Sequence, residues 1–168
     1  MKMIVLGCGR VGSHLATALS AAGHQITVVD RDPRAFALFG EELLEESGTG
    51  ATRPATLVTA RSKITCILGL GIDEDVLTAA GIATAEVFAA VTDSDYTNIM
   101  ASLIAREIHG VPRVIARISD PKRERIFHDL GLETICPTTL GAQSVFALLK
   151  KPAAEKKTPP AGSSRRAR

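Results

Sequence analysis

The 168 residues predict an α/β fold, in which a doubly wound parallel sheet of six strands is followed by a C-terminal arm helix. Two observations carry this prediction: short apolar runs alternate with segments of helical periodicity, and glycines stand where the helices should end. Strands that alternate with helices form parallel sheets with right-handed crossovers, because each helix must pack back onto the sheet. With 45% hydrophobic residues, the chain can build one core of this kind.

The first strand–helix–strand unit lies in MIVLGCGRVGSHLATALSAAGHQITVVDRD, residues 3–32. Met3–Leu6 is apolar and too short for a helix, so we expect a buried strand there. Apolar residues then recur at helical spacing as far as Gly23, and QITVVD follows as a second strand that ends at Asp30. This order is typical of Rossmann-type folds.

Gly7, Gly9 and Gly12 form a G-x-G-x-x-G motif between the first strand and its helix. In this motif the first glycine permits a tight turn, the second lets a pyrophosphate approach the backbone, and the third lets helix and strand pack closely. The helix N-terminus adds free N–H groups and a partial positive charge that attract phosphates. We therefore predict a dinucleotide site, the alternative being glycines that only tighten the turn.

Three other residues qualify this prediction. Asp30 follows the last glycine of the motif by 18 residues, where an acid can accept hydrogen bonds from the adenosine ribose hydroxyls. A 2′-phosphate would face that carboxylate, so the sequence favours NAD over NADP, although Arg31 softens the exclusion. Arg10, inside the glycine loop, either faces phosphate or is a solvated surface arginine.

Seven further segments complete the expected alternation, and ligands of such a sheet bind at the carboxyl ends of its strands. The predicted strands are Lys63–Gly69, Glu86–Val91, Arg113–Ile118 and Glu133–Cys136, and the predicted helices are Asp73–Ala80, Asp95–His109 and Asp120–Leu130.

Two segments lie outside this plan. Residues 40–62 are longer than a connection needs. We expect their first half to extend the second helix, which follows the strand that ends at Asp30, and we expect SGTGATRP to be a loop. Residues 138–149, TTLGAQSVFALL, predict an amphipathic helix that docks on a partner subunit, with folding back onto its own domain as the alternative. Its apolar positions are Leu140, Val145, Phe146 and Leu149.

The expected organisation is a nucleotide-binding domain over residues 1–137, an arm helix over 138–149 and a disordered basic tail over 150–168. The tail holds seven Lys/Arg and one Glu, so within a total charge of +2 the remaining residues carry −4. An acidic body argues against a nucleic-acid-binding domain. We see neither a signal peptide nor an apolar run of membrane-spanning length.

The sequence lacks the residues that an enzyme would need for proton transfer or metal binding beside a bound cofactor. Tyr96 is followed four positions later by Met100 and not by the lysine of short-chain dehydrogenases. The four histidines fall on predicted helices or helix ends, where surface positions are expected, and no His/Cys/Asp cluster has metal-ligand spacing. Cys8, Cys66 and Cys136 suit reduced, buried thiols; for Cys8, in the glycine loop, a redox role is the alternative. We therefore expect no catalytic residues and no metal.

The chain resembles the N-terminal RCK or KTN domain, of TrkA-N type, found in regulators of Trk potassium uptake. The resemblance runs from Met1 to about Leu149. Besides the glycine motif and its acid, four stretches carry it: DEDVLTAAGI, FAAVTDSDYTNI, VIARISDP and LGLETICPT. It implies a non-enzymatic domain that binds NAD(H) or an adenine nucleotide such as ATP or ADP. It also implies a homodimer, and ring assembly under a membrane potassium transporter or channel.

The resemblance also implies site residues. The phosphate loop matches at Gly7, Gly9, Arg10, Val11 and Gly12, and the ribose acid matches at Asp30, beside Arg31. Thr92 and Asp93 end the fourth strand beside the ligand, and Arg117 matches an arginine that can approach nucleotide phosphates. An arginine at the end of an inner strand in any case needs an anion. Asp95 and Asn98 fit a helix start near the site, with a plain N-cap as the alternative for Asp95.

Three departures from the family pattern stand out. Leu70 follows Gly69 where the family has an acid near the adenine, so only apolar contact is expected there. The 40–62 segment is an insertion. The basic tail stands where the family has a C-terminal ligand-binding subdomain, and a second subunit could supply that subdomain.

The leading hypothesis is a cytoplasmic regulatory subunit on the inner face of the cell membrane that gates potassium uptake. The alternatives are an NAD-dependent oxidoreductase or redox-sensing fragment and a nucleotide-sensing partner of another membrane protein.

Overall fold

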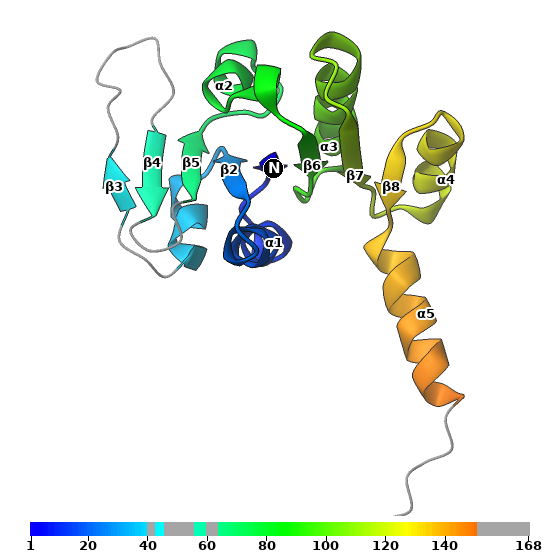
Figure 1. Cartoon of the computed structure of the whole chain (residues 1–168). Coiled ribbons are helices and arrows are strands. Elements are labelled where there is room, and N and C mark those ends of the chain that lie inside the picture. The colour runs from blue at the N-terminus through cyan, green and yellow to red at the C-terminus, as the bar shows by residue number, and fades with distance from the viewer. Residues whose placement is uncertain (40–42, 46–55, 60–63, 151–168) are drawn as a thin grey trace, which may run out of the picture.

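The computed structural model describes residues 1–39, 43–45, 56–59 and 64–150. Its centre is one sheet with the strand order β3-β4-β5-β2-β1-β6-β7-β8 (Figure 1). The six strands predicted from the sequence pair in parallel, which confirms the doubly wound, Rossmann-type fold. They are β1 (Lys2–Leu6), β2 (Gln25–Asp30), β5 (Thr65–Leu68), β6 (Val87–Ala90), β7 (Arg113–Arg117) and β8 (Glu133–Ile135).

The sheet is wider than the six strands predicted. Two short strands, β3 (Leu43–Glu45) and β4 (Thr56–Thr59), add an antiparallel pair beside β5. The expectation that the first half of residues 40–62 extends a helix was therefore wrong, and a 3₁₀ segment over Pro33–Phe39 replaces the second helix. Strands of three and four residues are too short to show a period in the sequence, whereas in the fold β4 covers the edge of β5. The SGTGATRP stretch lies outside the described residues.

In the described residues, five α-helices accompany the sheet. In Figure 1, α1 lies on one side of the sheet, and α2 and α3 lie on the other. The helix predicted over Asp95–His109 is in fact α-helical as far as Leu103 and continues as a π-helical turn, Ile104–Ile108. The α-helices are α1 (Arg10–Ala21), α2 (Glu74–Ala79), α3 (Asp95–Leu103), α4 (Pro121–Asp129) and α5 (Pro137–Leu149).

The central strand β1 divides the core into two layers. Ile4 and Leu6 pack into the cluster that includes residues of α2 and α3. Met3 and Val5 point to the opposite face and pack with α1 and the 3₁₀ segment. Because alternate residues of a strand face opposite sides, a strand buried on both faces reads as a continuous apolar run. This arrangement fixes the position of the glycine loop that follows β1.

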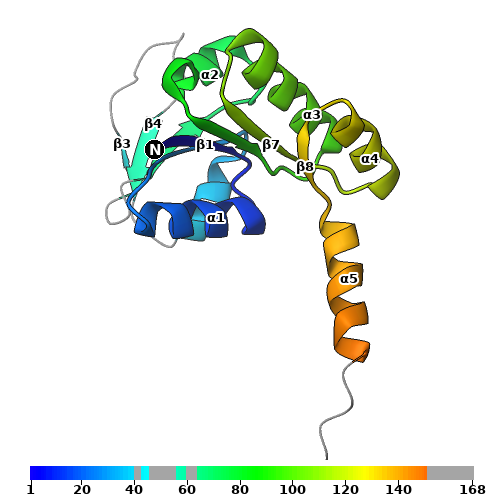
Figure 2. The same cartoon turned by 45° about the vertical axis from the view of Figure 1, so that its right-hand side comes forward.

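The helix α5 projects away from the rest of the chain (Figures 1 and 2). It contains no buried residue, so it does not fold back onto its own domain. Leu140, Val145 and Phe146 are each about half exposed or more. At about 100° per residue these three side chains point to different sides of the helix, so the predicted amphipathic pattern was wrong: the helix is apolar around most of its circumference.

The residues of the predicted basic tail after Lys150 lie outside the described part of the chain. Among the helices that the structure describes, none is both long and apolar enough to cross a membrane.

Candidate functional site

A pocket of about 760 Å³ lies where the chain leaves β1, β2, β5, β6 and β7. The strand order reverses between β1 and β6, so this is the topological switch point of the sheet. Eleven of the twelve residues predicted for the ligand line the pocket, and the twelfth, Gly12, lies beside the loop, as described below. The eleven are Gly7, Gly9, Arg10, Val11, Asp30, Arg31, Gly69, Leu70, Thr92, Asp93 and Arg117.

The three glycines of the loop have different surroundings. Gly7 has a φ of 101°, and a Cβ there would lie 2.9 Å from the backbone of Thr92, so both conformation and space require glycine. A Cβ on Gly12 would lie 1.8 Å from the carbonyl oxygen of Gly7, which explains the close packing of α1 on the loop. A Cβ on Gly9 would meet no protein atom within 4 Å. The open space at the second glycine is where a phosphate can approach.

The N-terminus of α1 faces this space without a side-chain cap. Gly9 is the N-cap residue and offers no side-chain acceptor, so the first-turn N–H groups of α1 are directed toward the pocket. Arg10 and Val11 begin the helix and are both exposed on the pocket lining. An uncapped N-terminus of a 12-residue helix attracts anions.

Asp30 ends β2 on the other side of the glycine loop. Its Oδ2 accepts a hydrogen bond from the backbone N–H of Cys8 over 2.6 Å, and its Oδ1 accepts one from the N–H of Asp32 over 2.9 Å. The carboxylate is half-buried and keeps unused lone pairs toward the pocket. Asp30 therefore both supports the loop and can accept hydrogen bonds from a diol.

The charges beyond β2 also bear on selectivity. Arg34 donates from Nε and Nη2 to the carboxylate of Asp32, at 3.0 and 2.9 Å. The hydrogen bond from the Arg34 side chain lowers the pKa of Asp32, so this second carboxylate stays ionised at the rim of the pocket. Arg34 is engaged by this pair, and Arg31 is the remaining cation next to Asp30. A ligand phosphate at this end would meet two carboxylates.

Arg117, at the end of β7, enters the pocket from the opposite side. Its Nη1 donates to the carbonyl oxygen of Thr92 over 3.1 Å. Its Nε is buried and has no hydrogen-bond partner among the residues that the structure describes. A buried guanidinium nitrogen without a partner is costly, and an anion in the pocket would relieve that cost.

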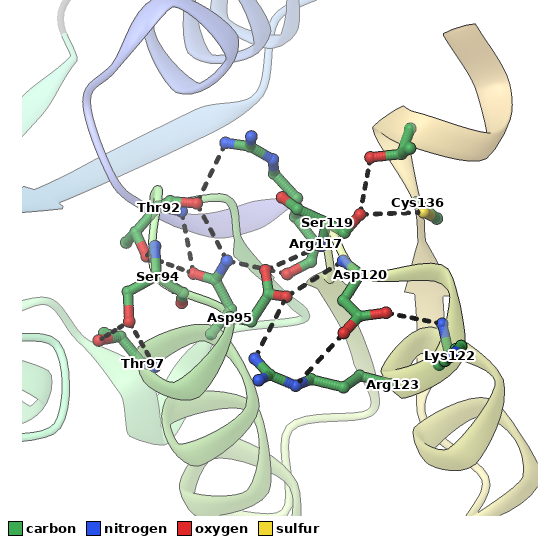
Figure 3. A network of polar contacts seen from close by, with 12 residues as sticks. Thr92, Ser94, Asp95, Thr97, Arg117, Ser119, Asp120, Lys122, Arg123 and Cys136 are labelled. Carbon is green, nitrogen blue, oxygen red and sulfur yellow. Dashed lines mark hydrogen bonds and ion pairs between the residues drawn. The ribbon is translucent and has the colours of Figure 1, made fainter. Parts of the chain in front are cut away.

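Asn98 holds together the strand ends that carry Thr92 and Arg117; both of these residues are labelled in the polar network of Figure 3. The side chain is completely buried. Its Oδ1 accepts from the N–H and the hydroxyl of Thr92, at 2.9 and 2.6 Å, and its Nδ2 donates to the carbonyls of Thr92 and Arg117, at 3.1 and 2.9 Å. The sequence placed Asn98 near the site; the structure shows that it braces β6 against β7.

Asp95 is the first residue of α3, as the sequence predicts, but it is not the N-cap, so that alternative is wrong. Ser94 is the N-cap, and its hydroxyl accepts from the N–H of Thr97. The Asp95 carboxylate instead accepts from the N–H groups of Ser119 and Asp120, at 2.8 and 3.2 Å. Residue spacing along the chain could not show this, because the partners are more than 20 residues away.

The thiols near the site are buried. Burial, with Cys66 and Asp30 as neighbours, raises the pKa of Cys8 to about 12, and burial raises that of Cys66 to about 12. The Sγ of Cys8 donates to the carbonyl of Ala35 over 3.4 Å. Because the reactive form of cysteine is the thiolate, a buried thiol with a raised pKa favours the packing role for Cys8 over the redox alternative.

Some pocket residues had no signal in the sequence. Leu38 and Ala35 come from the 3₁₀ segment, which the periodicity had not separated from a helix, and Ser94 and Thr97 come from the start of α3. Leu70 is 45% exposed and offers the apolar contact expected after β5. None of the four histidines lines the pocket. The described residues contain no group of three or more His, Cys, Asp or Glu that could hold a metal ion.

Comparison with known proteins places these features in a family. The family model of the TrkA-N domain matches residues 3–63 and 51–137. The Trk system potassium uptake protein TrkA of Streptomyces coelicolor is 39% identical over 155 residues, which are 92% of this chain and 61% of that protein. The chain therefore spans less than two thirds of the length of that relative.

Two solved structures share the fold at low sequence identity. The AMP-bound C-terminal domain of Kef from Shewanella denitrificans has a TM-score of 0.65 at 18% identity, covering 90% of this chain and 83% of that one. The GsuK channel bound to NAD has a TM-score of 0.58 at 20% identity, covering 81% of this chain and 21% of that one. The matched residues include the glycine loop, Asp30 and residues of all six parallel strands, and the chain belongs to the TrkA-N domain family.

Proposed function

We propose that this chain is a nucleotide-sensing regulatory domain of a potassium-uptake system. Its ligand is NAD(H), with ATP or ADP as the alternative, and it does no chemistry on that ligand. The relative from Streptomyces coelicolor, a Trk potassium uptake protein, supports the potassium system. The structures with AMP and NAD belong to other proteins of this fold and support the ligand class.

The observation that carries the proposal is the meeting of three features in one pocket. The uncapped N-terminus of α1 and the open space at Gly9 suit a pyrophosphate. Asp30 suits the ribose hydroxyls on one side. Arg117 brings a buried, unpartnered Nε from the other side, where it can bind a phosphate oxygen. A dinucleotide or an adenine nucleotide supplies each of these groups.

The residues that line the pocket support the proposal that the chain does no chemistry on its ligand. The ionisable side chains there are three arginines, three aspartates and Cys8. The Cys8 pKa of about 12 keeps the thiol protonated. Hydride transfer to a carbonyl substrate needs a proton donor near the nicotinamide, and the described lining contains no histidine, lysine or tyrosine for that role.

The arm supports assembly as a homodimer. The exposed apolar side chains of α5, among them Phe146 and Leu149, are too extensive to remain in water without consequence. The register of the sheet puts Ile115 and Ile135 on the face where α1 lies, and Ile135 is 41% exposed. The arm of a second copy would cover such apolar surface, and ring assembly would extend the same contact.

The mechanism is one of differential affinity. A nucleotide that binds one geometry of the dimer better than another shifts the population toward it. The arm passes that change to a membrane potassium transporter, which places the chain on the cytoplasmic side of the membrane.

Calorimetric titration of the full chain tests the ligand. We expect NADH to bind more tightly than NADPH, and ADP or ATP to compete with NADH for the same pocket. The same preparation is then incubated with NADH and a panel of carbonyl compounds. Steady NADH oxidation would contradict the regulatory function and favour an oxidoreductase.

A transport assay tests the partner. In a bacterial strain that lacks its own Trk regulator, potassium uptake through a Trk membrane transporter is measured with the wild-type chain and with Gly9→Val. We expect uptake to respond to the wild-type chain alone. An identical response to both would show that nucleotide binding does not regulate transport.

A further inference from the structure

The segment Arg117–Asp120 belongs both to the pocket and to the base of the arm. Arg117 enters the pocket with its side chain, while its carbonyl oxygen accepts from Nδ2 of Asn98. Ser119, two residues later, contacts the first turn of α5. Figure 3 shows Arg117, Ser119 and Cys136 in one network of polar contacts.

On the pocket side, this segment is held to the end of β6 and the start of α3. Asn98 uses both Oδ1 and Nδ2 in hydrogen bonds to Thr92 and Arg117, so these two residues cannot move independently without breaking buried hydrogen bonds. The Asp95 carboxylate holds the N–H of Ser119, and its side chain is 10% exposed. The position of Ser119 therefore follows the position of β6 and β7 under the pocket.

On the arm side, the carbonyl oxygen of Ser119 accepts from the hydroxyl of Thr138 over 2.7 Å. It also accepts a longer contact from Sγ of Cys136, at 3.6 Å. Thr138 is the second residue of α5, and no residue of that helix is buried. With so little packing against its own domain, the helix takes its direction from the chain at Cys136 and from this hydrogen bond.

We propose that the Ser119–Thr138 hydrogen bond is the point at which occupancy of the pocket sets the orientation of the arm. Asn98 and Asp95 are positioning residues for this connection. A phosphate oxygen bound at Nε of Arg117 acts on the same side chain whose Nη1 donates to the carbonyl of Thr92, and the change reaches Ser119 through the braced strand ends. This inference rests on the proposed nucleotide-sensing function and names the path of its regulation.

Hydrogen exchange of the full chain, followed by mass spectrometry over residues 119–149, tests this path with NADH and with ADP. Four proteins are compared: wild type, Thr138→Val, Thr138→Ser and Thr139→Val. Thr138→Val keeps the shape and removes the hydroxyl, whereas Thr138→Ser keeps the hydroxyl. Thr139 is the matched control, because it neighbours Thr138 on α5 and makes no side-chain hydrogen bond to the described residues.

We expect nucleotide to change exchange at the start of α5 in wild type, Thr138→Ser and Thr139→Val. In Thr138→Val that nucleotide-dependent change should fall at least about threefold, while nucleotide affinity shifts by no more than about tenfold, the equivalent of one net hydrogen bond. A merely structural role for Thr138 would alter exchange equally with and without nucleotide.

The outcomes separate the two proposals. Nucleotide binding to wild type without any change in α5 overturns the inference and leaves the proposed function standing. An equal nucleotide response in Thr138→Val and wild type, or an equal loss in Thr139→Val and Thr138→Val, also overturns it. A wild-type chain that binds neither NADH nor ADP overturns the proposed function, and the inference with it.

Discussion

The carboxylate of Asp30 accepts a hydrogen bond from the backbone N–H of Cys8 over 2.6 Å. The acid that ends β2 therefore also holds the glycine loop that follows β1. We propose that its role in binding has two parts, support of the loop and contact with the ribose, and substitutions can separate them.

Asp30→Ala should weaken NADH binding by roughly 1.5–3 kcal/mol, the range for hydrogen bonds to a charged group, and should reduce the preference over NADPH. Asp30→Asn can keep one acceptor for the Cys8 N–H, so it should leave the loop in place while still losing cofactor preference. Calorimetry with both cofactors measures this. Equal losses for NADH and NADPH in both variants would contradict the ribose role.

Gly9→Val should abolish dinucleotide binding and leave the domain folded. The side chain would occupy the space of the pyrophosphate, while the first atom beyond Cα meets no protein atom. Gly12→Ala is the matched contrast, because its Cβ would lie 1.8 Å from the Gly7 carbonyl oxygen. That overlap should cost about 1–3 kcal/mol of stability or more. Thermal unfolding and calorimetry are measured together; unchanged NADH affinity in folded Gly9→Val would place the site elsewhere.

Arg117→Met should weaken binding of NADH and ADP by about 1.5–3 kcal/mol, since a charge-assisted hydrogen bond to phosphate is lost. The unbound protein should lose little stability, because the buried Nε has no partner among the described residues and the Thr92 carbonyl, which loses its bond from Nη1, keeps the one from Asn98. Arg113→Gln is the control: it lies on the same strand, but its guanidinium pairs with Glu133 at the surface. If both variants bind nucleotide like wild type, Arg117 does not contact phosphate.

Truncation after Pro137 should weaken dimerisation at least about tenfold, the equivalent of burying one apolar side chain or less, and keep nucleotide binding. Two point variants refine this test within α5. Val145→Glu places a charge on the apolar arm and should weaken the dimer, whereas Gln143→Glu changes a polar position of the same helix. Sedimentation with and without nucleotide measures the dimerisation of each variant. A full-length chain that stays monomeric at tens of micromolar, an order-of-magnitude threshold, would contradict the arm's role.

Cys8 and Cys66 should resist alkylation in the folded chain. Their pKa values of about 12 lie above the ordinary 9.0, so at about pH 9 only about one thiol in a thousand is ionised. A thiol pKa that is higher in the folded than in the unfolded chain contributes to the free energy of unfolding. This contribution is complete below about pH 9 and is lost as the pH rises toward about 12. Mass spectrometry after iodoacetamide treatment, native and denatured, checks it. Rapid native labelling of Cys8 would instead support a redox role.

The sequence by itself determined the parallel strands, the glycine loop and the residues that gather at the pocket. These follow from local rules: apolar runs bury strands, glycines permit particular turns, and parallel strands bring their carboxyl ends to one edge. Such rules need only neighbouring residues, and for this reason Gly7 and Asp30 could be assigned before their distances were known, whereas the contact of Arg117 with phosphate was implied by the family resemblance.

Only the tertiary structure decided how those residues are supported. The β3–β4 pair, the bracing of Thr92 and Arg117 by Asn98, and the bond from Thr138 to Ser119 join segments that lie apart in the chain. The hydrogen bond from the N–H of Ser119 to Asp95, a residue for which the sequence predicted only a helix start near the site, also joins distant segments. Hydrogen bonds between distant segments depend on how strands and helices pack together, and no period or spacing along the chain records that packing.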